Sequence, residues 1–140
     1  MTREARVRQV VLADFLGAWR LDREVVHADG LRARLLGRAV WTPRGAEALY
    51  VESGRLTIEG QGSFEAERRY LWSADLEVFF EDGRFFHRVP GAGGPAGHWC
   101  APDQYDVSYD FSGWPVWSCR WQVTGPRKDY CMRSRYLRER

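Results

Sequence analysis

HWCAPDQYDVSYDF, residues 98–111, is the stretch that decides the fold. Its first half carries chemically active groups, namely the imidazole, thiol, carboxylate and phenol of His98, Cys100, Asp103 and Tyr105. Its second half alternates apolar and polar residues. Successive side chains of a β-strand point to opposite faces of a sheet, so this alternation predicts a strand over 103–111 whose odd positions face a core.

The chain beyond residue 17 repeats this two-residue period, with turn signals such as Asp29-Gly30, Ser53-Gly54 and Asp82-Gly83 between the runs. The glycine- and proline-rich segment 90–102 is predicted to be a mobile loop at a barrel mouth. Ten short strands favour an all-β, antiparallel up-and-down β-barrel, because an open meander would leave two long edges unpaired. The predicted strands are 18–27, 31–42, 46–52, 55–59, 63–73, 75–81, 84–89, 103–111, 115–124 and 129–137.

A short amphipathic helix is predicted before the first strand. Val7, Val10, Val11 and Phe15 fall at helical spacing, and Gly17 ends the pattern after about three turns.

Composition limits the class of protein. A chain of 140 residues with 44% hydrophobic and 14% aromatic content is enough for one domain, predicted to span 1–140. The net charge of +2 is too balanced to indicate nucleic acid or an anionic membrane as a partner. The oligomeric state is not set by the sequence.

The N-terminal residues lack the apolar core of a secretory signal, and no segment approaches a transmembrane run. The three cysteines, Cys100, Cys119 and Cys131, are an odd number, which favours reduced thiols over a disulfide framework. We therefore expect a cytoplasmic protein without disulfides.

Alternation also predicts which side chains of the other strands point into the barrel. In 63–73 the even positions, Phe64, Arg68, Tyr70 and Trp72 among them, are predicted to point inward. Trp19, Arg23 and His27 are predicted to do the same from the first strand, and Phe85 and His87 from 84–89. The predicted interior is thus aromatic with a few polar groups, and core packing is the favoured role of the seven tryptophans.

Arg68 is the residue for which a purely structural role is hardest to explain. A guanidinium among apolar side chains needs an anion or several acceptors. Glu52, Asp103 and a ligand are the candidates. An internal ion pair and a ligand-binding role both remain open.

Gly17-Ala18-Trp19, directly after a short helix, resembles the Gly-x-Trp signature of lipocalins and their calycin relatives. The resemblance implies a calycin barrel in which Trp19 packs on an arginine of the last strand, with Arg133 or Arg135 as that partner. The fatty-acid-binding branch carries an Arg-x-Tyr pair on this strand, where the present chain has Arg133-Ser134-Arg135-Tyr136. This departure weakens the implied carboxylate clamp.

Four stretches also resemble an uncharacterised family known only as a domain of unknown function. They are GAWRLDR at 17–23, the F-x-x-x-R-x-Y-L-W pattern at 64–72, H-x-C-x-x-D-x-Y at 98–105, and the closing GPRKDY at 125–130. The likeness covers nearly the whole chain and implies no activity.

Two kinds of chemistry at residues 98–103 are possible but not favoured. His98, Cys100 and Asp103 have atoms that bind metals, but structural zinc recruits four ligands and the other histidines lie on different strands. A Cys100–histidine nucleophile pair has no supporting motif around it. The sequence predicts neither a metal nor a cofactor.

The predicted function is the binding of a small, partly apolar, anionic molecule inside the barrel. An alternative is a barrel enzyme in which His98, Asp103, Tyr105 and Tyr130 transfer protons at the mouth to a ligand held by Arg68. A haem-binding barrel with His87 or His98 as axial ligand is less favoured, because no haem-flanking motif is present. The predicted ligand-binding residues are Arg23, Glu52, Arg68, Tyr70, Trp72, His87, His98, Asp103, Tyr105 and Tyr130.

Overall fold

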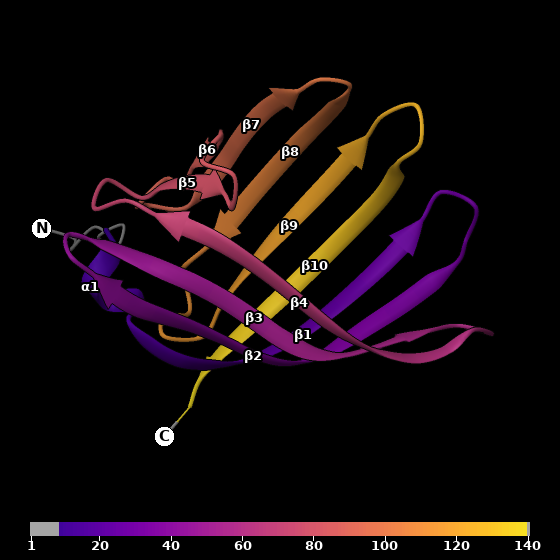
Figure 1. The fold of residues 1–140 in the computed structure, drawn as a ribbon, viewed down its shortest axis with the longest axis horizontal. Helices are drawn as coiled ribbons and strands as arrows, with labels where there is room; N and C mark the ends of the chain where they lie inside the picture. Colours follow the sequence, from indigo (N-terminus) through magenta and orange to yellow (C-terminus); the bar gives the residue numbers. More distant parts are fainter. Residues whose placement is uncertain (1–8, 140) are drawn as a thin grey trace, which may run out of the picture.

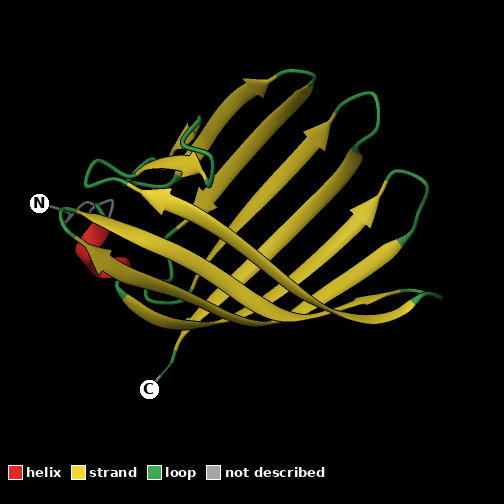
Figure 2. Cartoon of the chain, viewed as in Figure 1, coloured by secondary structure: helices red, strands yellow, loops and turns green. Residues whose placement is uncertain are grey.

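The computed structural model describes residues 9–139, and its chain is almost entirely β-structure (Figure 2). One short helix precedes ten antiparallel strands, as the alternation predicts. In chain order the elements are α1 (Leu12–Phe15), β1 (Gly17–His27), β2 (Arg32–Arg44), β3 (Glu47–Ile58), β4 (Gly62–Trp72), β5 (Glu77–Phe80), β6 (Phe85–Arg88), β7 (Gly94–Cys100), β8 (Asp103–Asp110), β9 (Trp117–Thr124) and β10 (Asp129–Arg138).

The strands form one sheet in the order β6-β5-β4-β3-β2-β1-β10-β9-β8-β7, which curls into a nearly closed barrel (Figure 1). Pairing of β1 with β10 joins the two ends of the meander. The described ladders leave one seam, between β6 and β7, where side chains meet instead of backbones. There the ring of Phe85 lies 5.5 Å from that of His98, and Arg84 Nη1 lies 3.6 Å from Cys100 Sγ. The predicted fold class is confirmed, with this seam in place of full closure.

Figure 1 shows α1 at one end of the barrel. This end is packed with aromatic rings. Phe15 is fully buried, and its ring centroid lies 5.1 Å from that of Trp72 and 5.4 Å from those of Trp41 and Trp117. The helix itself is a single turn, shorter than predicted; Val7 lies outside the described residues. Its role is to place Phe15 as a plug under the strands.

Trp19 is also fully buried at this end and is clasped by an arginine, but not by either predicted one. The guanidinium carbon of Arg138 lies 4.0 Å from the ring centroid of Trp19, and Arg138 also donates to the carbonyls of Leu16 and Asp14 at 2.7 and 2.6 Å. Arg133 and Arg135 point outward, because the even positions of β10 are the buried ones. The predicted clasp therefore exists, with Arg138 as its cation.

The predicted turn at Ser53-Gly54 is wrong, because β3 runs unbroken from residue 47 to residue 58. Gly54 lies opposite Gly37 of β2, and a Cβ added to Gly37 would lie 2.0 Å from the Ser53 carbonyl oxygen. Gly37 and Gly54 therefore allow two strands to approach closely, a role that glycine has in barrels besides forming turns.

The predicted loop over residues 90–102 is also wrong in its second half, which forms β7. Pro95 and the glycines are tolerated because β7 pairs only with β8 and has no ladder on its other side. The ring of Trp99 points to solvent, whereas His98 and Cys100 are half-buried on the inner face.

Two inward assignments need correction. A register shift between Val78 and Phe79 interrupts the ladder of β5 with β6, and as a result Phe86 and His87 are both buried while Phe85 is exposed. Phe64 lies on the inner side of β4 but near the end of the strand, so its ring is 49% exposed.

Candidate functional site

A cavity of about 310 Å³ lies inside the barrel, and its lining includes Leu31 and Gln61 from the turns that join β1 to β2 and β3 to β4. Figure 1 shows these two turns at the end of the barrel opposite α1. The cavity's walls are largely aliphatic, from Val25, Ala33, Leu35, Leu56, Ile58 and Met132. Its polar lining residues are Arg23, His27, Glu52, Gln61, Glu67, Arg68 and Tyr130. Four of these, Arg23, Glu52, Arg68 and Tyr130, belong to the predicted ligand-binding set. The cavity is therefore an apolar chamber with convergent charges.

A buried ion pair forms the floor of this cavity. Arg23 on β1 and Glu52 on β3 make a two-pronged contact, with Arg23 Nη2 2.9 Å from Glu52 Oε1 and a second bond between Nη1 and Oε2. Arg23 Nε also donates to Ser134 Oγ at 2.7 Å. Both charged side chains are almost fully buried, so each requires the other.

Two tyrosines complete the floor. Tyr50 Oη donates to Glu52 Oε1 at 2.5 Å and lies 2.9 Å from Tyr136 Oη. Burial alone would raise the pKa of Glu52, but Arg23 outweighs it and holds the pKa below its ordinary value. Burial, together with the neighbouring carboxylate, raises the pKa of Tyr50 well above its ordinary value. The floor thus consists of a charged pair and neutral phenols.

Arg68 lies directly opposite Glu52 in the register of β3 and β4, yet Glu52 turns its carboxylate to Arg23. The other predicted partner, Asp103, pairs with Lys128 Nζ at 3.1 Å. Among residues 9–139 the structure records no ion pair for Arg68; its guanidinium carbon lies 6.0 Å from the ring centroid of Trp121. The cavity therefore holds two guanidinium groups and one buried carboxylate.

The remaining predicted residues lie elsewhere. Tyr70, Trp72 and His87 surround a void of about 20 Å³ below the floor, where His87 Nε2 lies 2.8 Å from Tyr109 Oη. Burial, and then the nearby His98, lowers the pKa of His87 to about 3. Its Nδ1 has no partner among the described residues. A void of this size has no room for a porphyrin, so His87 does not fit the haem-ligand role considered above.

The side chains proposed for the enzyme alternative, those of His98, Asp103, Tyr105 and Tyr130, make no direct hydrogen bond to one another, and only Asp103 and Tyr105 share a partner. Lys128 links Asp103 to Tyr105, with its Nζ 3.4 Å from Tyr105 Oη. His98 instead packs against phenylalanine rings at the seam. Tyr130 packs against His27 at the rim of the cavity, with ring centroids 5.5 Å apart and the ring planes tilted by 48°. Nothing in residues 9–139 places three His, Cys, Asp or Glu side chains close enough to hold a metal ion.

Sequence reasoning missed the floor residues Tyr50, Ser134 and Tyr136. The alternation of the last strand carries the signal for two of them, because its even positions 130, 132, 134 and 136 are the inward ones. The resemblance to calycins directed attention to the odd arginines of the same strand.

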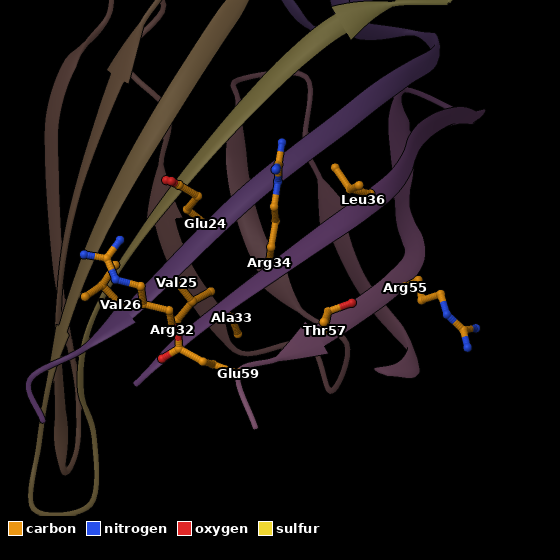
Figure 3. Close-up of a pocket in the computed structure, with 10 residues that line it drawn as sticks. All are labelled: Glu24, Val25, Val26, Arg32, Ala33, Arg34, Leu36, Arg55, Thr57 and Glu59. Atoms are coloured by element: carbon orange, nitrogen blue, oxygen red, sulfur yellow. The ribbon is translucent and has the colours of Figure 1, made fainter. Parts of the chain in front are cut away.

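A larger groove of about 690 Å³ lies on the outer face of β1, β2 and β3 (Figure 3). It is bordered by charged side chains, including Glu24, Arg32, Arg34 and Arg55, which project away from the strands. Arg34 is held by Asp22 at 2.7 Å and Arg55 by Glu65 at 3.1 Å. The groove is exposed to solvent, so the interior cavity is the better candidate for enclosing a small molecule.

Comparisons with known proteins place the fold. The model of a family of unknown function, DUF6314, matches residues 15–138. No curated protein matches the sequence. Among solved structures, the S-type phycobiliprotein lyase CPES from Guillardia theta is similar, with a TM-score of 0.63 and 8% identity over 91% of this chain and 90% of that one. Residues 9–139 contain no helix with the length and hydrophobicity needed to cross a lipid bilayer.

Proposed function

This chain belongs to the DUF6314 family of unknown function, and we propose that its barrel binds a small, partly apolar, anionic molecule in the cavity above the Arg23–Glu52 pair. The observation that carries the proposal is the position of Arg68. It borders an apolar chamber, and the two carboxylates that could neutralise it are engaged by other cations.

The chemistry of the cavity indicates the ligand class. A guanidinium offers a rigid fork of donors that matches a carboxylate, sulfonate or phosphate. The aliphatic walls favour an apolar body on the same molecule. A volume of about 310 Å³ is near the lower end of the range for small-molecule sites, so the ligand is small.

The barrel architecture agrees with this proposal. Nearly closed barrels of this size can enclose one small ligand. A phycobiliprotein lyase shares the fold, which is consistent with a small-molecule site, although at 8% identity the likeness extends to the fold alone.

The test uses two fluorescent probes of the same shape. Anilinonaphthalene sulfonate is anionic, and N-phenyl-1-naphthylamine is its uncharged counterpart. We expect Arg68→Met to lower the affinity for the anionic probe by roughly 10- to 100-fold, which corresponds to the loss of a hydrogen bond to a charged group. Binding of the uncharged probe should change little, because the apolar walls remain.

The matched control is Arg69→Met. Arg69 is the next residue of β4, points to the outer face and pairs with Glu67 at 3.0 Å. Both variants should keep the circular dichroism spectrum of the wild type. Equal affinity of the anionic probe for wild type and Arg68→Met, with both folded, would remove Arg68 from the site and with it the proposed ligand class.

A further inference from the structure

The outer face of strands β2, β1, β10 and β9 concentrates arginines that the modest net charge of the chain conceals. The outward positions are the even residues of β1, β2 and β9 and the odd residues of β10, opposite to the buried set. We call this surface the arginine face. It comprises Arg20, Arg32, Arg34, Arg38, Arg120, Arg133 and Arg135, with Asp22, Glu24 and Leu36 among them.

Several of these arginines face each other across the sheet. Arg133 lies directly opposite Arg120 in the β10–β9 ladder, and Arg20 lies opposite Arg38 in the β1–β2 ladder. Like charges in opposite positions destabilise a sheet. The β1–β10 ladder places Glu24 opposite Arg133 and Asp22 opposite Arg135, so these carboxylates offset part of the repulsion. An anionic partner would offset the rest.

The carboxylates nearby neutralise only part of the surface. Asp22 holds Arg34 at 2.7 Å, and Glu139 holds Arg38 at 2.8 Å. For the other five arginines of the face, the structure records no ion pair within 4.0 Å among residues 9–139. These guanidinium groups are exposed and free to form bidentate contacts with a partner.

The shape of the face suits an extended segment. A groove of about 650 Å³ follows β1, β10 and β9, with Arg120, Arg133 and Arg135 along it. It meets the groove of Figure 3 at Glu24 and Arg34, which line both. Leu36 projects into the second groove and is 53% exposed, which supplies an apolar contact among the charges.

We propose that the arginine face docks an acidic protein segment that also carries an apolar side chain. Arginine together with an apolar anchor is a composition found at protein interfaces. Asp22 and Glu24 stand in the middle of the face and would repel the evenly spaced charges of a nucleic acid or an anionic membrane. A protein segment can place its own carboxylates opposite the arginines and avoid those two positions.

The experiment measures fluorescence anisotropy of labelled probes with the full chain. The main probe is a peptide of glutamate and leucine; the comparison probes are a glutamate-only peptide, duplex DNA and phosphatidylserine vesicles. We expect the glutamate and leucine peptide to bind most tightly. The double variant Arg120→Ser, Arg133→Ser should lower the affinity for this peptide about tenfold or more, because two charge-assisted contacts are lost. Leu36→Ser should weaken this peptide and leave the glutamate-only peptide unchanged.

The control replaces arginines on other parts of the barrel. Arg69→Ser with Arg88→Ser changes the net charge of the chain equally and should leave the affinity unaltered. Unfolding curves for every variant establish that each is folded. Equal weakening by the control pair, absence of peptide binding to the wild type, or tighter binding of DNA or vesicles than of the peptide would each overturn the proposal.

Discussion

The two ends of the barrel differ in how they use the same alternation of side chains. At the α1 end the inward side chains are largely aromatic, and the rings of Phe15, Trp19 and Trp117 are almost fully buried. At the other end the inward positions are aliphatic or charged, and a cavity of about 310 Å³ remains. Large rings at one end provide the stability that permits an incompletely filled chamber at the other. The comparison predicts that substitutions at the two ends have different consequences.

The largest loss of stability is expected at the packed end. Trp19→Ala should lower the free energy of unfolding by about 3–5 kcal/mol, because it removes a fully buried indole and leaves a void. A double-mutant cycle with Arg138→Ala should give a coupling energy of about 0.5–1 kcal/mol for the cation–π contact. The same cycle with Arg135, which points outward, should give none. Urea unfolding measures all of these, and coupling to Arg135 instead of Arg138 would contradict the clasp described here.

A loss of similar size is expected at the floor of the cavity, but for an electrostatic reason. Arg23→Met should cost about 3–5 kcal/mol, because Glu52 remains buried without its cation. Adding Glu52→Leu should recover most of this loss, since both buried charges are then gone. The measurement is again denaturant unfolding at neutral pH. If the double variant is as unstable as the single one, the pair has a role beyond mutual neutralisation.

A smaller, pH-dependent effect is expected from His87 beneath the floor. Burial holds the pKa of His87 at about 3, whereas an unfolded histidine titrates near 6.5. The unfolded state therefore binds an extra proton between these values, and stability falls as the pH decreases through that window. Between pH 7 and pH 5 the contribution should be about 2 kcal/mol.

Replacing His87 with glutamine should flatten this dependence, whatever it does to stability at pH 7. His27→Gln, at the rim of the cavity, is the matched control and should keep the slope of the wild type. A slope unchanged by His87→Gln would show that other groups cause the acid sensitivity.

The smallest effect on stability is expected for Arg68→Met, the counterpart of Arg23→Met across the same cavity. Arg68 is exposed and has no recorded ion pair among residues 9–139, so its loss leaves no buried charge behind. The free energy of unfolding should change by about 1 kcal/mol or less. Thermal unfolding followed by circular dichroism is sufficient, and a loss as large as that of Arg23→Met would indicate a structural role for Arg68.

Only some of the predicted ligand-binding residues line the same cavity. Arg23, Glu52, Arg68 and Tyr130 line one cavity, because they lie at inward positions of neighbouring strands in the same half of the barrel. His87 and Trp72 point inward too, but they lie deeper, beyond the Arg23–Glu52 pair. Alternation predicts whether a side chain points into or out of the barrel, but it gives little information about its position along the barrel axis. That position depends on the register between strands, which cannot be read from the sequence of one strand.

The sequence by itself determined the properties that arise from local patterns. The two-residue period is a consequence of strand geometry, so it predicted the antiparallel barrel, most inward positions and the burial of Trp19. Where a local signal had two physical meanings, prediction failed. The glycine at position 54 marks close strand contact instead of a turn, and the proline at position 95 is accepted by an unpaired strand edge.

Only the tertiary structure decided the partners of the charges. Glu52 is next to Arg68 in the sheet, and nothing local indicates that it binds Arg23 instead. Arg23 and Glu52 lie on β1 and β3, the two strands that flank β2, so their contact depends on the register and curvature of three strands. The register of β1 with β10 places Arg138 opposite Trp19. Such pairs join residues distant in sequence, so their selection follows from strand register and curvature and cannot be obtained from periodicity.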